Sequence, residues 1–140
     1  MTAGREIAMF CFKYAVVAGL MAGFVQPVFA ADDGLSQTFS NCMDQAGGGT
    51  QSMVECIGAE TERQDLRLNN AYRDIMAGLS AERKKQLQEA QRLWIKYRKA
   101  NCDFYYDPEG GTIARVNAND CFMSATAARA KELEALKPQD

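Results

Sequence analysis

The sequence contains no histidine and only three prolines. Histidine is the side chain that most often moves protons in enzymes near neutral pH, and carboxylate di-metal bundles need it in their Glu-x-x-His pairs. No Cys-x-x-Cys pair offers the spacing of a zinc site either. We therefore expect no catalytic residue, no metal and no cofactor, and an enzyme is the least favoured class of function.

An excess of positive charge is also missing, because 16 lysines and arginines stand against 18 acidic residues. This excludes the basic surface that nucleic-acid binding requires, and the weakly negative field slightly favours a cationic partner. The clustered acids do not indicate glycoside cleavage, since they share one predicted helix whose convex face offers no cleft between two carboxylates. These acids are Glu55, Glu60, Glu62 and Asp65.

The chain opens with an apolar segment that we interpret as a targeting signal. No charged residue occurs at positions 14–31, and the tripeptide VFA within this run suits signal peptidase. A single membrane anchor is the alternative, but Pro27 leaves the run short of the roughly 20 apolar residues that a spanning helix needs. We predict a signal peptide at residues 1–30 and one exported domain at residues 31–140.

The rest of the chain has apolar residues at helical spacing and no alternating stretch long enough for a strand. Ser80 is a good N-cap for one segment, and Thr50 and Thr112 are expected to cap two others. Tyr97 and Tyr105 fall on a predicted inner stripe. We predict an all-α fold, a small antiparallel bundle of about four helices. Their expected ranges are 35–46, 51–78, 81–104 and 113–136.

Four cysteines remain after the predicted cleavage, and an even number in an exported domain indicates two disulfides. If the second and third helices form an antiparallel hairpin that turns near residue 80, all four thiols gather at one end of the bundle. Three pairings are possible. Cys42–Cys56 and Cys102–Cys121 are favoured because each closes a local hairpin across a glycine turn, and each would contribute roughly 3 kcal/mol to stability.

The same hairpin geometry pairs polar residues of the second and third helices. Asn69 and Gln91 lie equally far from the turn, and Asp65 and Arg98 are less than one helical turn out of level. We predict an amide pair and a carboxylate–guanidinium pair beside the apolar stripes, where they would fix the register of the hairpin. Ordinary surface placement of these residues is the alternative.

An ordered set of motifs, spread over residues 42–136, resembles the lysozyme inhibitor LprI-like N-terminal domain family. The motifs are Cys42, Cys56, Asp65-x-x-Leu68-Asn69-x-x-Tyr72, Gln91-x-x-Trp94-x-x-Tyr97-Arg98-x-x-x-Cys102, Gly110-Gly111-Thr112 and Cys121-x-x-x-x-Thr126-x-x-Arg129. The resemblance implies a small exported bacterial helical domain. The named activity of the family, inhibition of lysozyme, is attributed to a lipoprotein member. This chain lacks a lipobox, so membrane anchoring does not carry over. No inhibitory residue can be transferred, because the shared motifs are mostly what a bundle needs to hold together.

Two stretches of the sequence are candidates for the surface that contacts a partner. The segment QRLWIKYRKANC (91–102) is predicted to be core, because Trp94 and Tyr97 lie on the inner stripe. The next stretch, DFYYDPEGGT (103–112), is the better candidate, since aromatic anchors with a charged rim commonly give small interfaces their affinity. Its candidate binding residues are Tyr105, Tyr106, Asp107 and Glu109. The alternative is that Phe104 and Tyr105 cover the end of the bundle.

Two kinds of binding function fit these features. One is an inhibitor of lysozyme or of a related peptidoglycan hydrolase, and the other is a periplasmic interaction or scaffold domain with a different partner. In both cases we expect a protein partner, no nucleic acid, no stable membrane anchor after cleavage, and a periplasmic or secreted location.

Overall fold

The computed structural model describes residues 34–136, and within this range the chain forms four helices and no strand. The helices are α1 (Gln37–Ala46), α2 (Thr50–Gly78), α3 (Ala81–Phe104) and α4 (Gly111–Ala135). The all-α prediction is confirmed, and each predicted boundary falls within two residues of the observed one. The predicted signal peptide, residues 1–30, lies outside the described residues.

The N-terminal ends of the helices follow the sequence only in part. Ser80 caps α3 as predicted, and its side chain accepts a hydrogen bond from the Arg83 backbone N–H. The predicted Thr50 and Thr112 caps are wrong, because α2 and α4 begin at or before these residues and have glycines at their N-cap positions. The Thr50 hydroxyl instead donates to Thr112 Oγ1 at 3.3 Å, which links the starts of α2 and α4.

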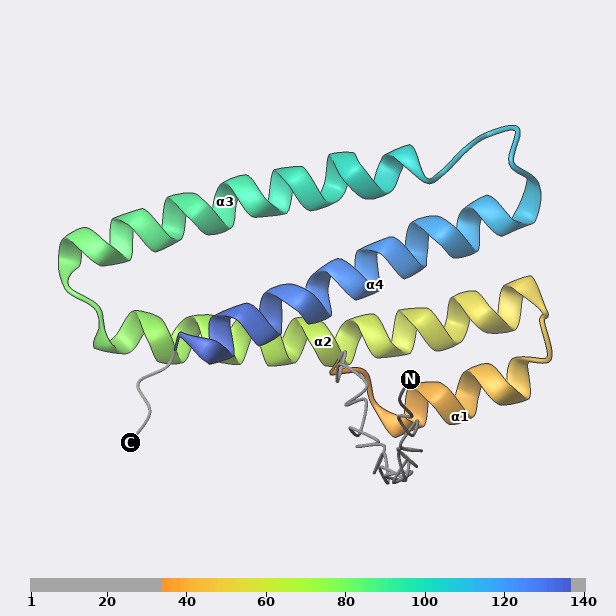
Figure 1. Cartoon of the computed structure of the whole chain (residues 1–140), viewed down its shortest axis with the longest axis horizontal. Coiled ribbons are helices and arrows are strands. Elements are labelled where there is room, and N and C mark those ends of the chain that lie inside the picture. The colour runs from red at the N-terminus through yellow and green to blue at the C-terminus, as the bar shows by residue number, and fades with distance from the viewer. Residues whose placement is uncertain (1–33, 137–140) are drawn as a thin grey trace, which may run out of the picture.

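The packing of the helices does not follow their order in the chain. α4 runs beside α2 in the same direction, and α3 runs in the opposite direction (Figure 1). α2 makes most of its contacts with α4, whereas α3 packs mainly on α4 and touches α2 little. α2 and α3 are antiparallel and joined by a short turn, as predicted, but the prediction that they pack against each other as a hairpin is wrong. Leu79 and Ser80, both extended, join the two helices and let them diverge.

The hydrophobic core lies between α2 and α4. In its first part Ala71 of α2 and Ala130 of α4 are almost completely buried together with Leu133. In its second part Ile57 packs with Met123, and residues of α1 cover this pair. Short side chains such as alanine let two helices approach closely, so the α2–α4 contact is tight.

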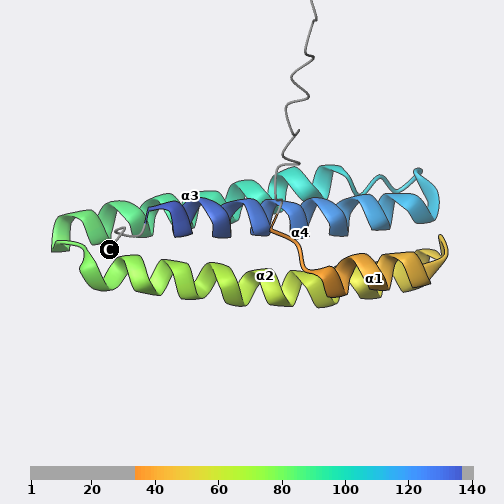
Figure 2. The same cartoon turned by 60° about the horizontal axis from the view of Figure 1, so that its bottom comes forward.

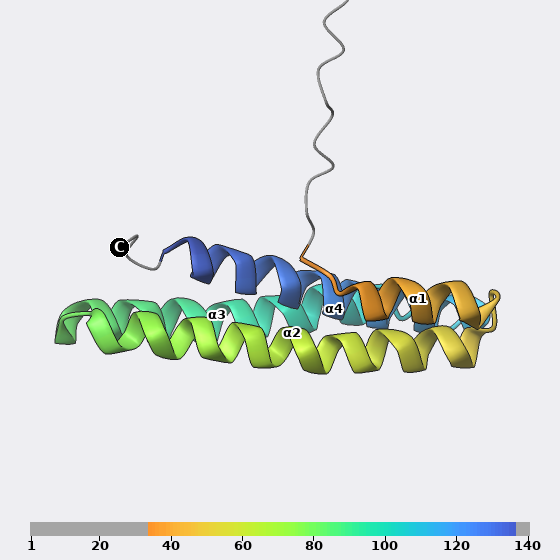
Figure 3. The ribbon, with the colours of Figure 1, turned by 90° about the horizontal axis from the view of Figure 1, so that it is seen from below.

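α1 covers the N-terminal half of α2, as Figure 2 shows. The C-terminal half of α4 lies on the same side of α2, over the other half of that helix (Figure 3). Arg67 of α2 marks this second contact, because its Nε and Nη2 both donate to the Glu134 carboxylate at 2.7 and 2.5 Å. α1 and the C-terminal half of α4 thus together cover one side of α2 along its length.

The two predicted disulfides are present. Cys42–Cys56 joins α1 to α2 with a Cα–Cα distance of 5.7 Å, and Cys102–Cys121 joins α3 to α4 with a distance of 5.5 Å. Both distances are ordinary for disulfides. The favoured connectivity is confirmed, and the second bridge ties α3 to the rest of the bundle near its C-terminal end.

A buried carboxylate, Glu60, also holds the start of α1. Its side chain accepts hydrogen bonds from the Ser36 backbone N–H at 2.9 Å, the Ser36 hydroxyl at 2.6 Å, Gln64 Nε2 at 2.6 Å and Arg63 Nε at 2.7 Å. Burial raises the pKa of Glu60, but these hydrogen bonds outweigh burial and hold the pKa below its ordinary value. This role was not predicted, although Glu60 lies three residues after Ile57 and eight before Leu68, on the buried stripe of α2.

Candidate functional site

The segment between α3 and α4 is held by covalent and polar contacts at its base. The Cys102–Cys121 bridge closes the loop, and the Asn101 side-chain amide donates to Cys121 Sγ at 3.4 Å. Within the loop, Asp107 Oδ1 accepts the Glu109 backbone N–H at 2.9 Å, and the Asp107 carbonyl accepts the Gly110 N–H at 3.1 Å. The loop is thus an ordered turn on a fixed base.

All four candidate binding residues of this loop are exposed to solvent. Tyr105 and Tyr106 expose 48% and 54% of their surface, and Asp107 and Glu109 are exposed as well. Phe104, which the sequence left as a possible cover for the end of the bundle, is 85% exposed and meets Tyr105 edge to face with ring centroids 6.0 Å apart. The alternative in which Phe104 and Tyr105 cover the end of the bundle is therefore wrong.

Most of the exposed large apolar side chains belong to the second half of α3, this loop and the start of α4. Nine large hydrophobic residues are exposed in the described part of the chain, and seven of them lie between positions 93 and 113. Phe104, Tyr105 and Tyr106 are consecutive and lie together at the loop, and exposed apolar groups that lie together mark interaction sites on small proteins. The seven are Leu93, Ile95, Tyr97, Phe104, Tyr105, Tyr106 and Ile113.

Tyr97 and Tyr105 are both part of this exposed group, so the prediction that they lie on the inner stripe is wrong. Only Gln91 and Cys102 of α3 are buried, which means that the inward face of α3 is narrow and Tyr97 falls beside it. The other apolar motif residues do face the core. Leu68 is buried, and Tyr72 and Trp94 pack, partly buried, against the same cluster.

Arg98 is the main polar contact between α3 and α4. Its guanidinium lies between two aromatic rings, 4.6 Å from the Trp94 centroid and 3.9 Å from the Phe122 centroid, and Nη1 donates to Thr126 Oγ1 at 2.6 Å. The predicted partner Asp65 lies 3.5 Å from Nη1. Desolvated cation–π contacts hold more strongly than exposed ion pairs, so the aromatic rings and the threonine fix this side chain more than Asp65 does.

The predicted Asn69–Gln91 pair is wrong. Gln91 Oε1 accepts a hydrogen bond from Arg129 Nε of α4 at 3.0 Å, and Asn69 is exposed. The reason is that α4, and not α2, lies opposite α3. Phe122 was not singled out from the sequence, although Phe122, Thr126 and Arg129 follow one another at helical spacing on the side of α4 that meets α3.

Residues 34–136 offer little for metal or membrane chemistry. No group of three or more cysteine, aspartate or glutamate side chains in this range is arranged to hold a metal ion. No helix in the same range has an apolar stretch able to cross a bilayer. What the described residues do present is a rigid, exposed aromatic surface with acidic residues at its edge.

Comparison with known proteins yields one family and one relative. Residues 42–133 match the sequence model of a family described as "Lysozyme inhibitor LprI". An uncharacterised protein of Rhizobium meliloti (strain 1021) is 27% identical over 95 aligned residues, which cover 58% of this chain and 68% of that protein. No solved structure matches.

Proposed function

Because the chain belongs to the lysozyme inhibitor LprI family, we propose that it is an exported binding module that inhibits lysozyme or a related peptidoglycan hydrolase. Its two disulfides suit a compartment outside the cytoplasm, such as the periplasm or the medium. The module acts by occupying its partner and carries out no catalysis of its own.

The observation that carries this proposal is the exposure of Phe104, Tyr105 and Tyr106 on a loop with a disulfide at its base. Aromatic side chains bury a large area for little loss of conformational freedom, which is why they dominate the energy of small interfaces. The fixed base keeps the cost of ordering the loop on binding low. We assign these residues, with Tyr97 about two helical turns before Phe104 on α3, as the contact surface.

Charge supports lysozyme as the partner. Asp107 and Glu109 are exposed next to the tyrosines, and lysozymes are generally cationic enzymes whose cleft contains carboxylates. Acidic groups at the rim speed encounter with a cationic protein and orient it, while the aromatic centre supplies most of the affinity. A carboxylate of the loop would also meet basic residues around such a cleft.

A triple variant of the loop tests the assignment. Tyr106→Ala, Asp107→Asn and Glu109→Gln together should weaken inhibition by about tenfold or more, because an aromatic anchor and two rim charges are removed at once. The measurement is the rate at which lysozyme clears a suspension of bacterial cell walls, recorded over a range of inhibitor concentrations. The oxidised, purified chain is used throughout.

A matched control separates loss of the contact from a general change of charge. Leu66→Ala, Glu62→Gln and Glu82→Gln remove one exposed apolar side chain and two charges elsewhere on the bundle, and this variant should inhibit like the unchanged chain. Equal inhibition by both variants would reject the loop as the contact surface. No inhibition by the unchanged chain would reject the function itself and favour an envelope interaction domain with another partner.

A further inference from the structure

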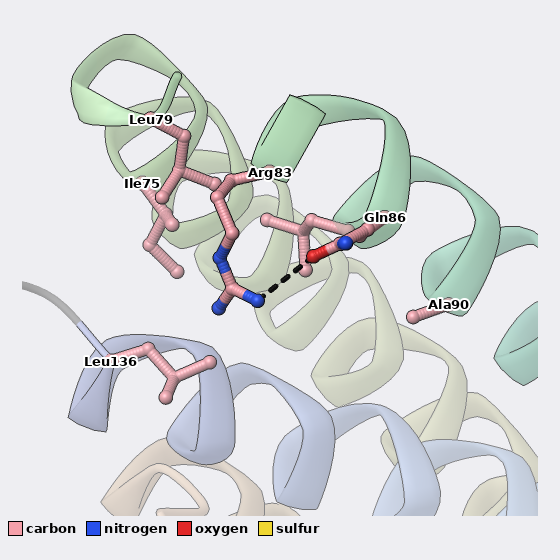
Figure 4. A pocket seen from close by; sticks show the side chains of 7 residues that line it. Ile75, Leu79, Arg83, Gln86, Ala90 and Leu136 are labelled. Atoms are coloured by element: carbon pink, nitrogen blue, oxygen red, sulfur yellow. Dashed lines mark hydrogen bonds between the residues drawn. The ribbon is translucent and has the colours of Figure 1, made fainter. Parts of the chain in front are cut away.

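A concave site that the proposed function does not use lies beside the turn between α2 and α3. Its volume is about 310 Å³. Five of its lining residues are aliphatic, and they come from α2, the turn after it, α3 and the end of α4 (Figure 4). These are Ile75, Leu79, Leu87, Ala90 and Leu136. The loop proposed to bind lysozyme joins the other ends of α3 and α4.

This cavity follows from the way in which the helices diverge. α3 leaves α2 after the extended residues Leu79 and Ser80 and then packs on α4 further along. Leu79 and Leu87 pack against the α2–α4 core cluster, so they form the floor of the cavity, while Ala90 is too small to fill the space above them. The fold therefore leaves an apolar recess that is open to solvent.

One cation reaches across this recess. Arg83 extends between Leu79 and Leu136 in Figure 4, and its Nη1 donates to Gln86 Oε1 at 2.9 Å. Within residues 34–136 the guanidinium takes part in no ion pair. Arg83 also lies in the first turn of α3, where the helix dipole adds positive potential. The recess thus combines a mainly aliphatic lining with a single cation, Arg83.

We propose that this recess binds a single-chain amphiphile with a carboxylate head, of the fatty-acid type. The alkyl chain lies on Leu79 and Leu87, and the carboxylate pairs with Arg83 in the fork geometry that guanidinium groups favour. A volume near the lower end of the range for ligand sites suits one short chain and not the two chains of a phospholipid.

The chain contains its own reporter for this binding. Trp94 is the single tryptophan, lies four residues after Ala90 on α3, and packs against the same core cluster as Leu79 and Leu87. Titration of the purified chain with decanoate, below the concentration at which decanoate forms micelles, should change the Trp94 emission in a saturable way. Decanol, which has the same chain and no charge, should bind more weakly.

Three variants distinguish this site from unspecific binding. Ala90→Phe fills the recess from a solvent-exposed position and should lower decanoate affinity at least tenfold. Arg83→Gln removes the cation and should lower affinity about fivefold, as expected for a partly exposed ion pair. Lys85→Gln removes an equal charge about 200° further round the helix and should leave affinity unchanged.

Each result decides the proposal. The pattern just described supports it, provided that circular dichroism shows all three variants folded. Absence of saturable binding, equal affinity of all variants, or decanol affinity equal to that of decanoate would overturn it. A change of oligomeric state caused by Ala90→Phe in the absence of decanoate would also overturn it, because the recess would then be an interface between two copies of the chain. None of these readouts depends on lysozyme inhibition.

Discussion

The α2–α4 contact and the helix α3 are built in different ways. α4 buries eight of its 25 residues, most of them apolar, whereas α3 buries only Gln91 and Cys102 out of 24. Burial of apolar surface is the main source of stability in a small domain. Most of the stability therefore lies between α2 and α4, and α3 is held by a disulfide, a turn, a few polar contacts and the partly buried Leu87 and Trp94.

The α2–α4 contact therefore supplies stability, whereas α3 and the loop after it supply the exposed surface. A helix that contributes little to the core can keep large apolar side chains in solvent, and α3 with the loop after it does so at Tyr97, Phe104 and Tyr106. The Cys102–Cys121 bridge and the Arg98 contacts keep that surface in place. We call α1, α2 and α4 the frame, and α3 with the loop after it the binding region. A substitution in one of these regions should leave the other unchanged, and the following predictions test this separation.

The largest expected effect is a truncation in the α2–α4 contact. Leu133 is completely buried and Leu93 on α3 is 52% exposed. Leu133→Ala should lower the free energy of unfolding by about 3–5 kcal/mol, because it removes buried methyl groups and leaves a cavity. Leu93→Ala should change it by less than about 0.5 kcal/mol. Urea unfolding followed by circular dichroism gives both values, and similar losses for the two variants would contradict the comparison.

The boundaries of the helices could be predicted because local signals set them. Glycine clusters interrupt the helical pattern, and Ser80 supplies a cap that needs no tertiary contact. The disulfide pairing was predictable for the same reason, since each bridge spans neighbouring segments. The exposure of Tyr106 and Asp107 followed from the proline and glycines around them.

The choice of packing partner for α2 could not be predicted from the order of the helices. α4 presents Ala127 and Ala130 at the contact, and short side chains allow a close approach to α2. α3 presents Trp94 and Arg98 instead, whose bulk sets it further out. The wrong partner for Gln91 and the wrong placement of Tyr97 both follow from this one difference, which depends on the shapes of two surfaces and not on spacing.

The next effect in size comes from the two disulfides, which close loops of similar length, with sequence separations of 14 and 19. Replacing either pair by serines should cost about 3 kcal/mol through the entropy of the unfolded chain. The local consequence should differ. Loss of Cys102–Cys121 should increase amide hydrogen exchange near the end of α3 and reduce lysozyme inhibition, whereas loss of Cys42–Cys56 should increase exchange in α1 and leave inhibition intact. The same exchange pattern for both pairs would argue against separate regions.

A smaller effect is expected at Glu60, which belongs to the frame. Glu60→Gln should lower stability by about 2 kcal/mol at neutral pH, because the amide cannot accept all the hydrogen bonds that the buried carboxylate receives. The pKa of Glu60 is lowered in the folded state from its ordinary value of 4.5. Its contribution is therefore complete above about pH 4.5 and is lost as the pH falls through the folded-state pKa. Unfolding at a series of pH values should show the difference between the two chains shrinking in acid, and a difference independent of pH would contradict this account.

The smallest effect concerns the one ion pair predicted between α2 and α3. Asp65 is 45% exposed and lies 3.5 Å from Arg98, whose guanidinium is already held by two rings and Thr126. Asp65→Asn should therefore cost less than about 1 kcal/mol, and Arg98→Met should cost more, because it removes the contacts to Trp94 and Phe122 as well. Unfolding of the two single variants and of the double variant gives the coupling between the residues. A coupling well above 1 kcal/mol would show that α2 holds α3 directly, and α3 could then no longer be regarded as a helix carried by α4.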